Sequence, residues 1–171
     1  MITMITGGAR SGKSRYAAEQ ALLLSDRPVH VATARIWDDE FRARVDRHRS
    51  ERGSAWECLE EEKTLGLLPL DGRVCVIDCV TLWLTNFFVD STSDAGFCLD
   101  AFRAEVDALR GRPGTFFVVT NEIGLGVHAD TEAGRKFTDL QGWANQYLAS
   151  VADRVVLMVS GIPVTIKAPV V

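Results

Sequence analysis

The chain has 171 residues, of which 47% are hydrophobic and 25% are charged. At about 100–200 residues per domain, this length and average composition predict one globular domain, residues 1–171, and exclude disordered, collagen-like and coiled-coil proteins. The 19 basic and 23 acidic side chains leave a net charge of −4, so the composition does not favour nucleic acid as the main ligand.

Hydrophobic periodicity predicts strands that alternate with helices along the chain. The predicted elements are, in chain order, strand Met1–Thr6, helix Ser14–Leu24, strand Val29–Thr33, helix Asp38–Arg52, strand Arg73–Cys79, helix Thr81–Val89, helix Phe97–Leu109, strand Thr115–Thr120, helix Thr131–Ala152, strand Arg154–Ser160 and a short strand Val164–Lys167. This alternation is typical of an α/β fold with a mostly parallel sheet and helices on both faces. Because ligands bind such sheets beyond the carboxyl ends of the strands, the places to search are the loops after Thr6, Thr33, Asp78, Thr120 and Ser160.

The four cysteines fit neither a disulfide framework nor a zinc site, because no two of them form a C-x-x-C pair. We expect buried, reduced thiols, as in a cytosolic protein. No window approaches the roughly 18 apolar residues of a membrane span. The first residues, MITMITGGARSGKS, lack the basic segment and apolar stretch of a signal peptide. Together these features predict a location in the cytoplasm.

The loop after the first predicted strand, Gly7–Ser14, reads GGARSGKS and matches the phosphate-binding pattern G-x-x-x-x-G-K-[ST]. Its glycines let successive backbone N–H groups point at one anion, and the following helix adds its positive N-terminal end. Lys13 is suited to reach the β- and γ-phosphates, and the Ser14 hydroxyl is suited to bind Mg²⁺. Asp78, which ends an apolar strand, is the second predicted magnesium ligand, and its alternative role is a cap. The sequence therefore predicts a site for a nucleoside triphosphate with Mg²⁺.

Asn121 and Glu122 end another predicted strand, where they are suited either to position substrate or water or to cap the chain. A guanine-binding motif of the N-K-x-D type is missing there, because Asn121 is followed by Glu-Ile-Gly. This argues against an ordinary GTPase switch and leaves other modes of guanine recognition open.

A basic segment surrounds His48, because residues 41–52 hold five arginines and two acidic residues, a local charge of 5 − 2 = +3. One interpretation is a structural histidine on a solvated, arginine-rich helix. The other is a nucleophile, since a neutral imidazole can attack phosphorus while the arginines stabilise the phosphate oxygens. Of the other two histidines, His30 lies in an apolar strand and is predicted to be structural, and His128 is a weaker candidate for substrate contact.

These features, in this order, resemble one family, the bifunctional adenosylcobinamide kinase/adenosylcobinamide-phosphate guanylyltransferase of cobalamin biosynthesis. The resemblance runs nearly end to end. It is carried by Thr6–Arg15 (TGGARSGKSR), Ala32–Ala34, Asp38–Glu40, Arg44–Arg49 with Arg52, Trp56, Glu60, the acid-terminated strand with Thr81, Thr85 and Asn86, Val119–Gly126, Ser160–Pro163 and Ile166–Lys167. It implies a RecA-like P-loop NTPase fold and a homo-oligomer, a homotrimer.

The resemblance also implies two reactions. In the first, ATP or GTP donates its γ-phosphoryl group to the aminopropanol hydroxyl of adenosylcobinamide. In the second, His48 attacks the α-phosphorus of GTP, expels pyrophosphate and passes GMP to the cobinamide phosphate, which gives adenosylcobinamide-GDP. The positions that match the family's nucleotide contacts are Gly8, Ala9, Arg10, Ser11, Gly12, Lys13, Ser14, Arg15, Thr33, Ala34, Arg35, Arg49, Ser50, Glu51, Arg52, Glu60 and Asp78. Some relatives carry Glu in place of Asp78, so a contact through water or with the ribose stays open beside a direct metal contact.

Two other functions remain compatible with the motifs. A plain small-molecule or nucleotide kinase would use the P-loop and Asp78, with His48 structural. A regulatory or motor module of RecA type would couple hydrolysis to a partner, but DNA or a large ring fits poorly with a net charge of −4. Because the predicted helix of His48 lies outside the P-loop, we hypothesise that it moves to reach the nucleotide or belongs to a neighbouring subunit's cleft.

Overall fold

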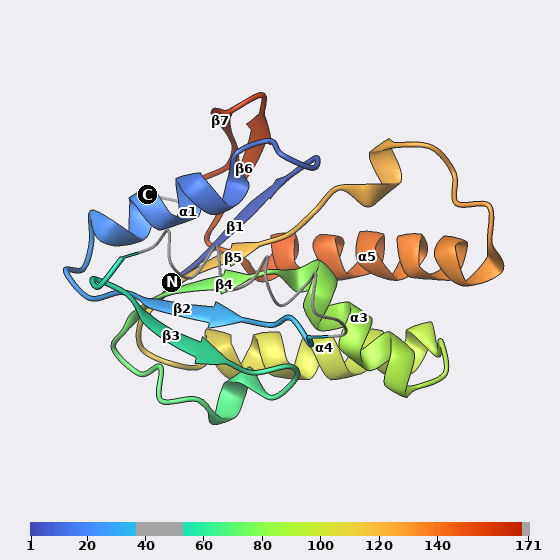
Figure 1. The fold of residues 1–171 in the computed structure, drawn as a ribbon, viewed down its shortest axis with the longest axis horizontal. Helices are drawn as coiled ribbons and strands as arrows, with labels where there is room; N and C mark the ends of the chain where they lie inside the picture. The colour runs from blue at the N-terminus through green and yellow to red at the C-terminus, as the bar shows by residue number, and fades with distance from the viewer. Residues whose placement is uncertain (37–52, 169–171) are drawn as a thin grey trace.

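The structure is a computed structural model that describes residues 1–36 and 53–168 (Figure 1). Its elements are, in chain order, β1 (Ile2–Gly7), α1 (Lys13–Leu22), β2 (Val29–Ala32), β3 (Glu57–Glu60), the 3₁₀ turn η1 (Leu65–Leu67), β4 (Val74–Asp78), α3 (Val80–Asp90), α4 (Ala95–Arg110), β5 (Thr115–Val119), the 3₁₀ turn η2 (Ile123–Leu125), α5 (Glu132–Val151), β6 (Arg154–Val159) and β7 (Ile162–Lys167). The predicted helix Asp38–Arg52 lies outside the described residues.

The strands form one seven-stranded sheet in the order β3-β2-β4-β5-β1-β6-β7. All neighbouring strands are parallel except β6 and β7, which pair antiparallel. The inner strands β1, β4 and β5 are nearly continuous apolar runs, as expected where both faces of a parallel strand are covered. Their carboxyl ends meet at one edge of the sheet, which therefore gathers the loops that follow them.

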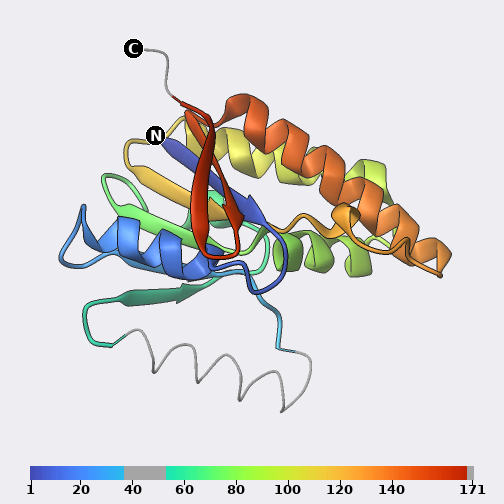
Figure 2. The ribbon, with the colours of Figure 1, turned by 90° about the horizontal axis from the view of Figure 1, so that it is seen from above.

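Helices cover both faces of the sheet, as predicted (Figure 2). On one face, α3, α4 and α5 pack their apolar sides over the strands, with Trp83, Phe102 and Leu140 fully buried. On the other face, α1 packs through Ala17 and Ala21, whose small side chains let the helix approach the sheet closely. The α/β architecture inferred from the sequence is thus confirmed.

Every predicted strand is present, and so is every predicted helix that falls in the described ranges, with ends that shift by a few residues. Hydrophobic periodicity did not predict β3, a four-residue strand with a glutamate at each end, which pairs with β2 at the edge of the sheet. The strand β7 starts at Ile162, two residues before the predicted start, because it pairs with β6 from the turn onward.

All four cysteines are free thiols, and Cys75, Cys79 and Cys98 are buried, whereas Cys58 is half-buried. No helix within residues 1–36 and 53–168 has both the length and the apolar character that crossing a membrane requires.

Candidate nucleotide-binding site

The P-loop links β1 to α1 at the carboxyl edge of the sheet, in the strand–loop–helix context that the motif requires. Its two outer glycines are needed for steric reasons. Gly7 has a φ of 147°, and a Cβ at this position would lie 2.6 Å from the carbonyl oxygen of Met158. Gly12, which caps the N-terminus of α1, has a φ of 95°, in the left-handed region that favours glycine. The loop therefore has the compact shape that presents backbone N–H groups to an anion.

The Lys13 side chain is folded over this loop. Its Nζ donates a hydrogen bond to the carbonyl oxygen of Gly8 at 2.6 Å, and the residue is buried. Burial lowers the pKa of the Lys13 ammonium group, whereas the acidic groups of Cys79, Asp78 and Glu122 act in the opposite direction. A positive charge thus lies inside the loop, with two carboxylates close enough to influence it.

A hollow of about 480 Å³ opens beside the loop and has the size of a small-molecule site. It is lined by Arg10, Ser11, Gly12, Lys13, Ser14, Arg15, Ser160 and Gly161. The turn between β6 and β7 closes one side, since the N–H of Gly161 donates to the carbonyl oxygen of Ser11 at 2.9 Å. The Ser11 hydroxyl is buried without a hydrogen-bond partner in the described structure, so this loop holds a polar group that no described residue satisfies. A second hollow, of about 520 Å³, lies between α4 and α5 and contains no P-loop residue.

Asp78 is the last residue of β4, which is adjacent to β5 and is separated from β1 by β5. Its Oδ2 lies 4.0 Å from Nε2 of the buried His30, whose ring also meets Trp56 edge-on at 6.3 Å between centroids. His30 therefore supports the strand that carries the acid, a contact that its apolar sequence context did not indicate. The adjoining Cys79 thiol is buried, which raises its pKa to about 11 and keeps it protonated near neutral pH.

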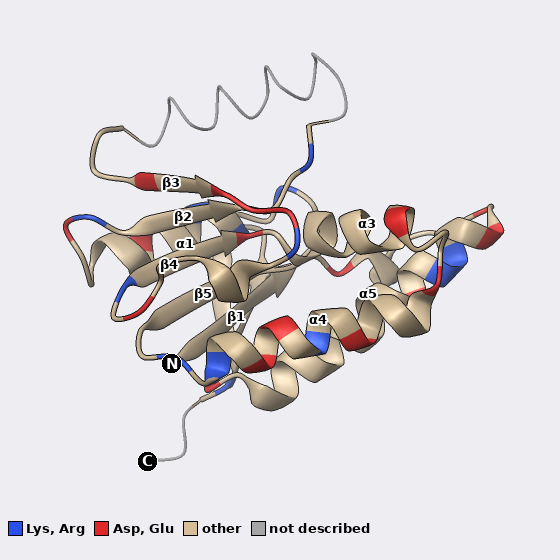
Figure 3. Cartoon of the chain, turned by 90° about the horizontal axis from the view of Figure 1, so that it is seen from below, with Lys and Arg blue, Asp and Glu red and all other residues tan. Residues whose placement is uncertain are grey.

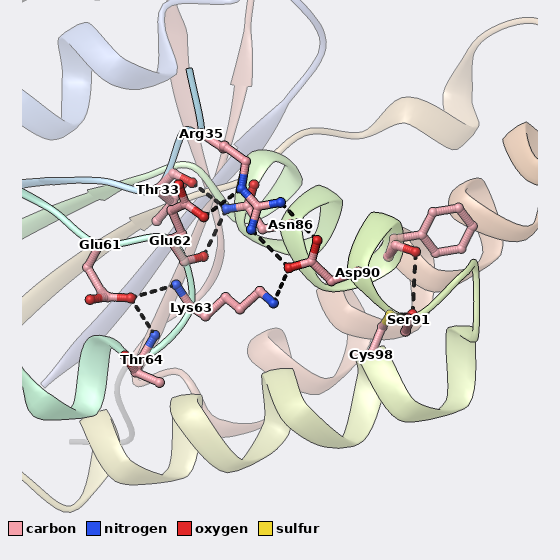
Figure 4. Close-up of polar contacts among 11 residues, drawn as sticks. Thr33, Arg35, Glu61, Glu62, Lys63, Thr64, Asn86, Asp90, Ser91 and Cys98 are labelled. Atoms are coloured by element: carbon pink, nitrogen blue, oxygen red, sulfur yellow. Dashed lines mark hydrogen bonds and ion pairs between the residues drawn. The ribbon is translucent and has the colours of Figure 1, made fainter. Parts of the chain in front are cut away.

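The segment after β2 is tied to α3 by polar contacts (Figure 4). The Thr33 hydroxyl is fully buried, and it both accepts from the N–H of Cys79 and donates to the Cys79 carbonyl oxygen. The Arg35 guanidinium donates its Nε to Glu62 at 2.6 Å and its two terminal nitrogens to the Asp90 carboxylate at 2.9 Å each. Two of the predicted nucleotide contacts, Thr33 and Arg35, thus already have protein partners.

Acidic residues are frequent along β3 and after it, because Glu57 and Glu60 are the two ends of the strand and further glutamates follow it in the loop (Figure 3). Lys63, in the same loop, pairs with Asp90, and Glu57 pairs with Arg73 at 2.9 Å. The cluster of Arg35, Glu62, Lys63 and Asp90 therefore balances two positive charges with two negative ones.

The remaining predicted contacts divide into two groups. Gly8, Ala9, Arg10, Ser14 and Arg15 are exposed around the P-loop, Ala34 is half-buried after β2, and Glu60 is exposed at the end of β3. His48, Arg49, Ser50, Glu51 and Arg52 lie outside the described residues. His128 is exposed in the loop before α5.

Glu122 also lies at the carboxyl edge of the sheet. The sequence left two roles open for it, either to position substrate or water or to cap the chain. It follows β5, and its N–H donates to the Gly7 carbonyl oxygen at 3.2 Å. Its side chain accepts a hydrogen bond from the hydroxyl of Thr6, at the end of β1. Asn121 donates to the Thr81 hydroxyl at 2.8 Å and so connects the same loop to α3. Asn121 therefore contacts α3, whereas Glu122 contacts the end of β1.

A mostly parallel sheet with helices on both faces and a complete P-loop defines a nucleoside triphosphate-binding protein of the P-loop class. The fold matches the flagellar accessory protein FlaH from Methanocaldococcus jannaschii with a TM-score of 0.51 and 12% identity, over 98% of this chain and 78% of that one. At this identity the likeness describes the fold alone.

Sequence comparison identifies the family. The model of cobinamide kinase / cobinamide phosphate guanyltransferase matches residues 3–166. The bifunctional adenosylcobalamin biosynthesis protein CobP of Pseudomonas aeruginosa is 39% identical over 98% of both chains. The protein CobU of Escherichia coli, which has the same description, is 37% identical over 98% of this chain and all of its own length. The chain belongs to this family, and it is a transferase with kinase and nucleotidyltransferase activities.

Proposed function

We propose that this protein phosphorylates the aminopropanol hydroxyl of adenosylcobinamide with ATP or GTP, and then transfers GMP from GTP to give adenosylcobinamide-GDP and pyrophosphate. The observation that supports this most strongly is the P-loop itself, folded around Lys13 at the edge where Asp78 and Glu122 also lie. Membership of the family supplies the acceptor chemistry.

In the first reaction, the backbone N–H groups of the P-loop hold the β- and γ-phosphates, and Lys13 neutralises the charge that develops on them. The Ser14 hydroxyl, exposed on α1, and the Asp78 carboxylate are oxygen donors of the kind that Mg²⁺ prefers. They fit a magnesium ion that arrives with the nucleotide, directly or through water. Bound Mg²⁺ supplies further neutralisation of the phosphate oxygens.

The second reaction needs a nucleophile aimed at the α-phosphorus, which the P-loop does not supply. We assign this role to His48, with Arg49, Ser50, Glu51 and Arg52 as its nucleotide-binding neighbours. The imidazole nitrogen forms a P–N bond to the α-phosphorus, and the P–O bond to the pyrophosphate leaving group breaks. An oxygen of the cobinamide phosphate then attacks the same phosphorus and releases the histidine.

The experiment is to incubate the protein with GTP labelled at the α-phosphate, denature it, and measure label that is acid-labile and alkali-stable. We expect such label on the wild type and none on His48→Ala, and the matched control His128→Ala, altered in an exposed histidine, should label normally. Label that survives in His48→Ala would overturn the assignment of the nucleophile.

The main competing function is a plain kinase in which His48 is structural. It predicts phosphoryl transfer without any covalent nucleotide, so an unlabelled wild type with intact kinase activity would favour it.

We also propose that the protein works in the cytoplasm as a homo-oligomer, a trimer, without nucleic acid as a partner. Sedimentation of the purified protein tests the oligomeric state.

A further inference from the structure

One oxygen of the Glu122 carboxylate accepts hydrogen bonds from the described residues, and the other accepts none from them. Its Oε1 accepts hydrogen bonds from the Thr6 hydroxyl at 2.5 Å and from Nδ2 of Asn145 at 3.2 Å. Within residues 1–36 and 53–168, its Oε2 has no hydrogen-bond partner, although Glu122 itself is only half-buried. A carboxylate oriented in this way has one oxygen fixed for geometry and one oxygen available to accept a proton.

The groups that hold Oε1 are themselves fixed. Asn145, on α5, accepts from the Thr120 hydroxyl at 2.6 Å and from Nε2 of Gln141 at 3.0 Å. Its amide also donates to the Asn121 carbonyl oxygen at 3.0 Å. Because Thr120, Gln141 and Asn145 are all buried, this network behaves as a rigid support for the carboxylate.

Glu122 lies beside the phosphate site, with its N–H bonded to the first residue of the P-loop. The Glu122 and Asp78 carboxylates both act on the buried ammonium group of Lys13, in the direction that raises its pKa. β5 lies between β1 and β4 in the sheet, so the loop after it lies between the P-loop and Asp78. An acceptor group placed in line with a γ-phosphate held there would come close to this loop.

We propose that Glu122 is the proton acceptor for the attacking hydroxyl in the phosphoryl-transfer step, an assignment that rests on the proposed kinase function. The acceptor oxygen forms a bond to the γ-phosphorus, the bond to the β-phosphate oxygen breaks, and the hydroxyl proton passes to Oε2 of Glu122. The nucleoside diphosphate leaves as the second product.

The same chemistry assigns Glu122 to only one of the two reactions. Guanylyl transfer uses a neutral imidazole and then a phosphate oxygen that is already ionised, so neither nucleophile has to lose a proton. A proton acceptor is needed only where the nucleophile is an alcohol. Loss of Glu122 should therefore separate the two activities.

The test is Glu122→Gln, because the amide oxygen can accept the same hydrogen bonds from Thr6 and Asn145 but cannot take up the proton. We expect kcat for phosphorylation of adenosylcobinamide to fall by about 10²–10⁴-fold with little change in KM, whereas labelling by α-labelled GTP stays within a few-fold of the wild type. Glu122→Asp should recover part of the activity.

The control is Glu132→Gln, which removes an exposed carboxylate paired with Lys136 on the same helix as Asn145 and should leave both activities unchanged. Kinase activity in Glu122→Gln equal to the wild type would mean that the residue only supports the loop, and would overturn the proposal. Equal loss of both activities would overturn it too, because a proton acceptor for the alcohol is not needed in guanylyl transfer. A wild type that takes the GMP label but phosphorylates no acceptor would instead contradict the proposed function itself.

Discussion

Asp90 is an exposed carboxylate that holds two cations at once. Arg35 contacts both of its oxygens, and Lys63 contacts one of them (Figure 4). Hydrogen bonds from Arg35, and then from Lys63, hold the pKa of Asp90 well below its usual range. The hydrogen bonds that Arg35 donates to Asp90 and Glu62 raise the pKa of its guanidinium further. The segment that follows β2 is therefore attached to α3 through the negative charge of the Asp90 carboxylate, which is lost when acid protonates it.

The pH dependence of this attachment has a definite sign. A carboxylate whose pKa is lower in the folded state contributes stability above its unfolded pKa, about 3.9 for Asp, and loses it progressively as the pH falls below that value. We therefore expect Asp90→Asn to lower the melting temperature at pH 7, and the difference from wild type to shrink as the pH falls from 4 towards 2.

The control for this measurement is Asp100→Asn, which alters an exposed aspartate whose one ion-pair partner among the described residues is Arg103, at 3.4 Å on the same helix. It should change the melting temperature little at any pH, as surface pairs usually do. A difference between Asp90→Asn and the wild type that is the same at pH 3 and pH 7 would mean that the ion pairs add no stability.

Several of the contacts that define the site join residues far apart in the chain. Thr6 bonds to Glu122, 116 positions away, and His30 lies against Asp78. The P-loop could be predicted because all of its chemistry lies within eight consecutive residues, Gly7–Ser14. The partners of Glu122 and Asp78 could not, because nothing local in a sequence tells which side chains a sheet will bring together.

The helix α5 joins the outer layer to the site through its buried polar residues. Gln141 and Asn145, one turn apart, both contact the Thr120 hydroxyl, and Asn145 also bonds to the Asn121 carbonyl oxygen. The apolar positions of this helix predicted it from the sequence, but they indicated no role for these two amides. Their burial means that each hydrogen bond is costly to lose.

We expect Asn145→Leu, which has a similar volume, to lower the free energy of unfolding by about 1–3 kcal/mol for each buried partner left without a hydrogen bond. It should also lower kinase activity more than GMP labelling, because Glu122 loses one of its two hydrogen bonds. The control Gln146→Leu lies on the exposed side of the same helix. Urea unfolding measures the stability, and equal stability of Asn145→Leu and the control would contradict the rigid network.

Elements with strong periodicity could be predicted from the sequence, and short edge elements could not. The helices α4 and α5 have clear apolar stripes, and the inner strands are continuous apolar runs. By contrast, β3 is four residues, two apolar ones between two glutamates, without the periodicity of a strand, and it pairs along the edge of β2. Tertiary pairing, rather than local preference, determines such strands.

At the scale of the whole molecule, the carboxyl ends of four strands, β1, β4, β5 and β6, meet around the P-loop. The loop after β5 bonds to Gly7, the turn after β6 bonds to Ser11, and Asp78 and Glu122 both influence Lys13. A nucleotide bound here would contact a junction between β1, α1 and the turn after β6. Such a ligand binds only the folded chain, so it stabilises the protein as a whole.

We therefore expect Mg²⁺ with GTP to raise the melting temperature of the wild type, and at a concentration of 100 times Kd the added stability is about 2.7 kcal/mol. Lys13→Ala should lose most of this shift, because the charge inside the loop is gone, and chelation of Mg²⁺ should reduce the shift in the wild type. The matched control Lys136→Ala removes an exposed charge on α5 that pairs with Glu132 at 2.7 Å and should keep the whole shift. If Lys13→Ala were stabilised as strongly as the wild type, the nucleotide phosphates would have to bind elsewhere than the P-loop, and the placement of both reactions at this edge would be wrong.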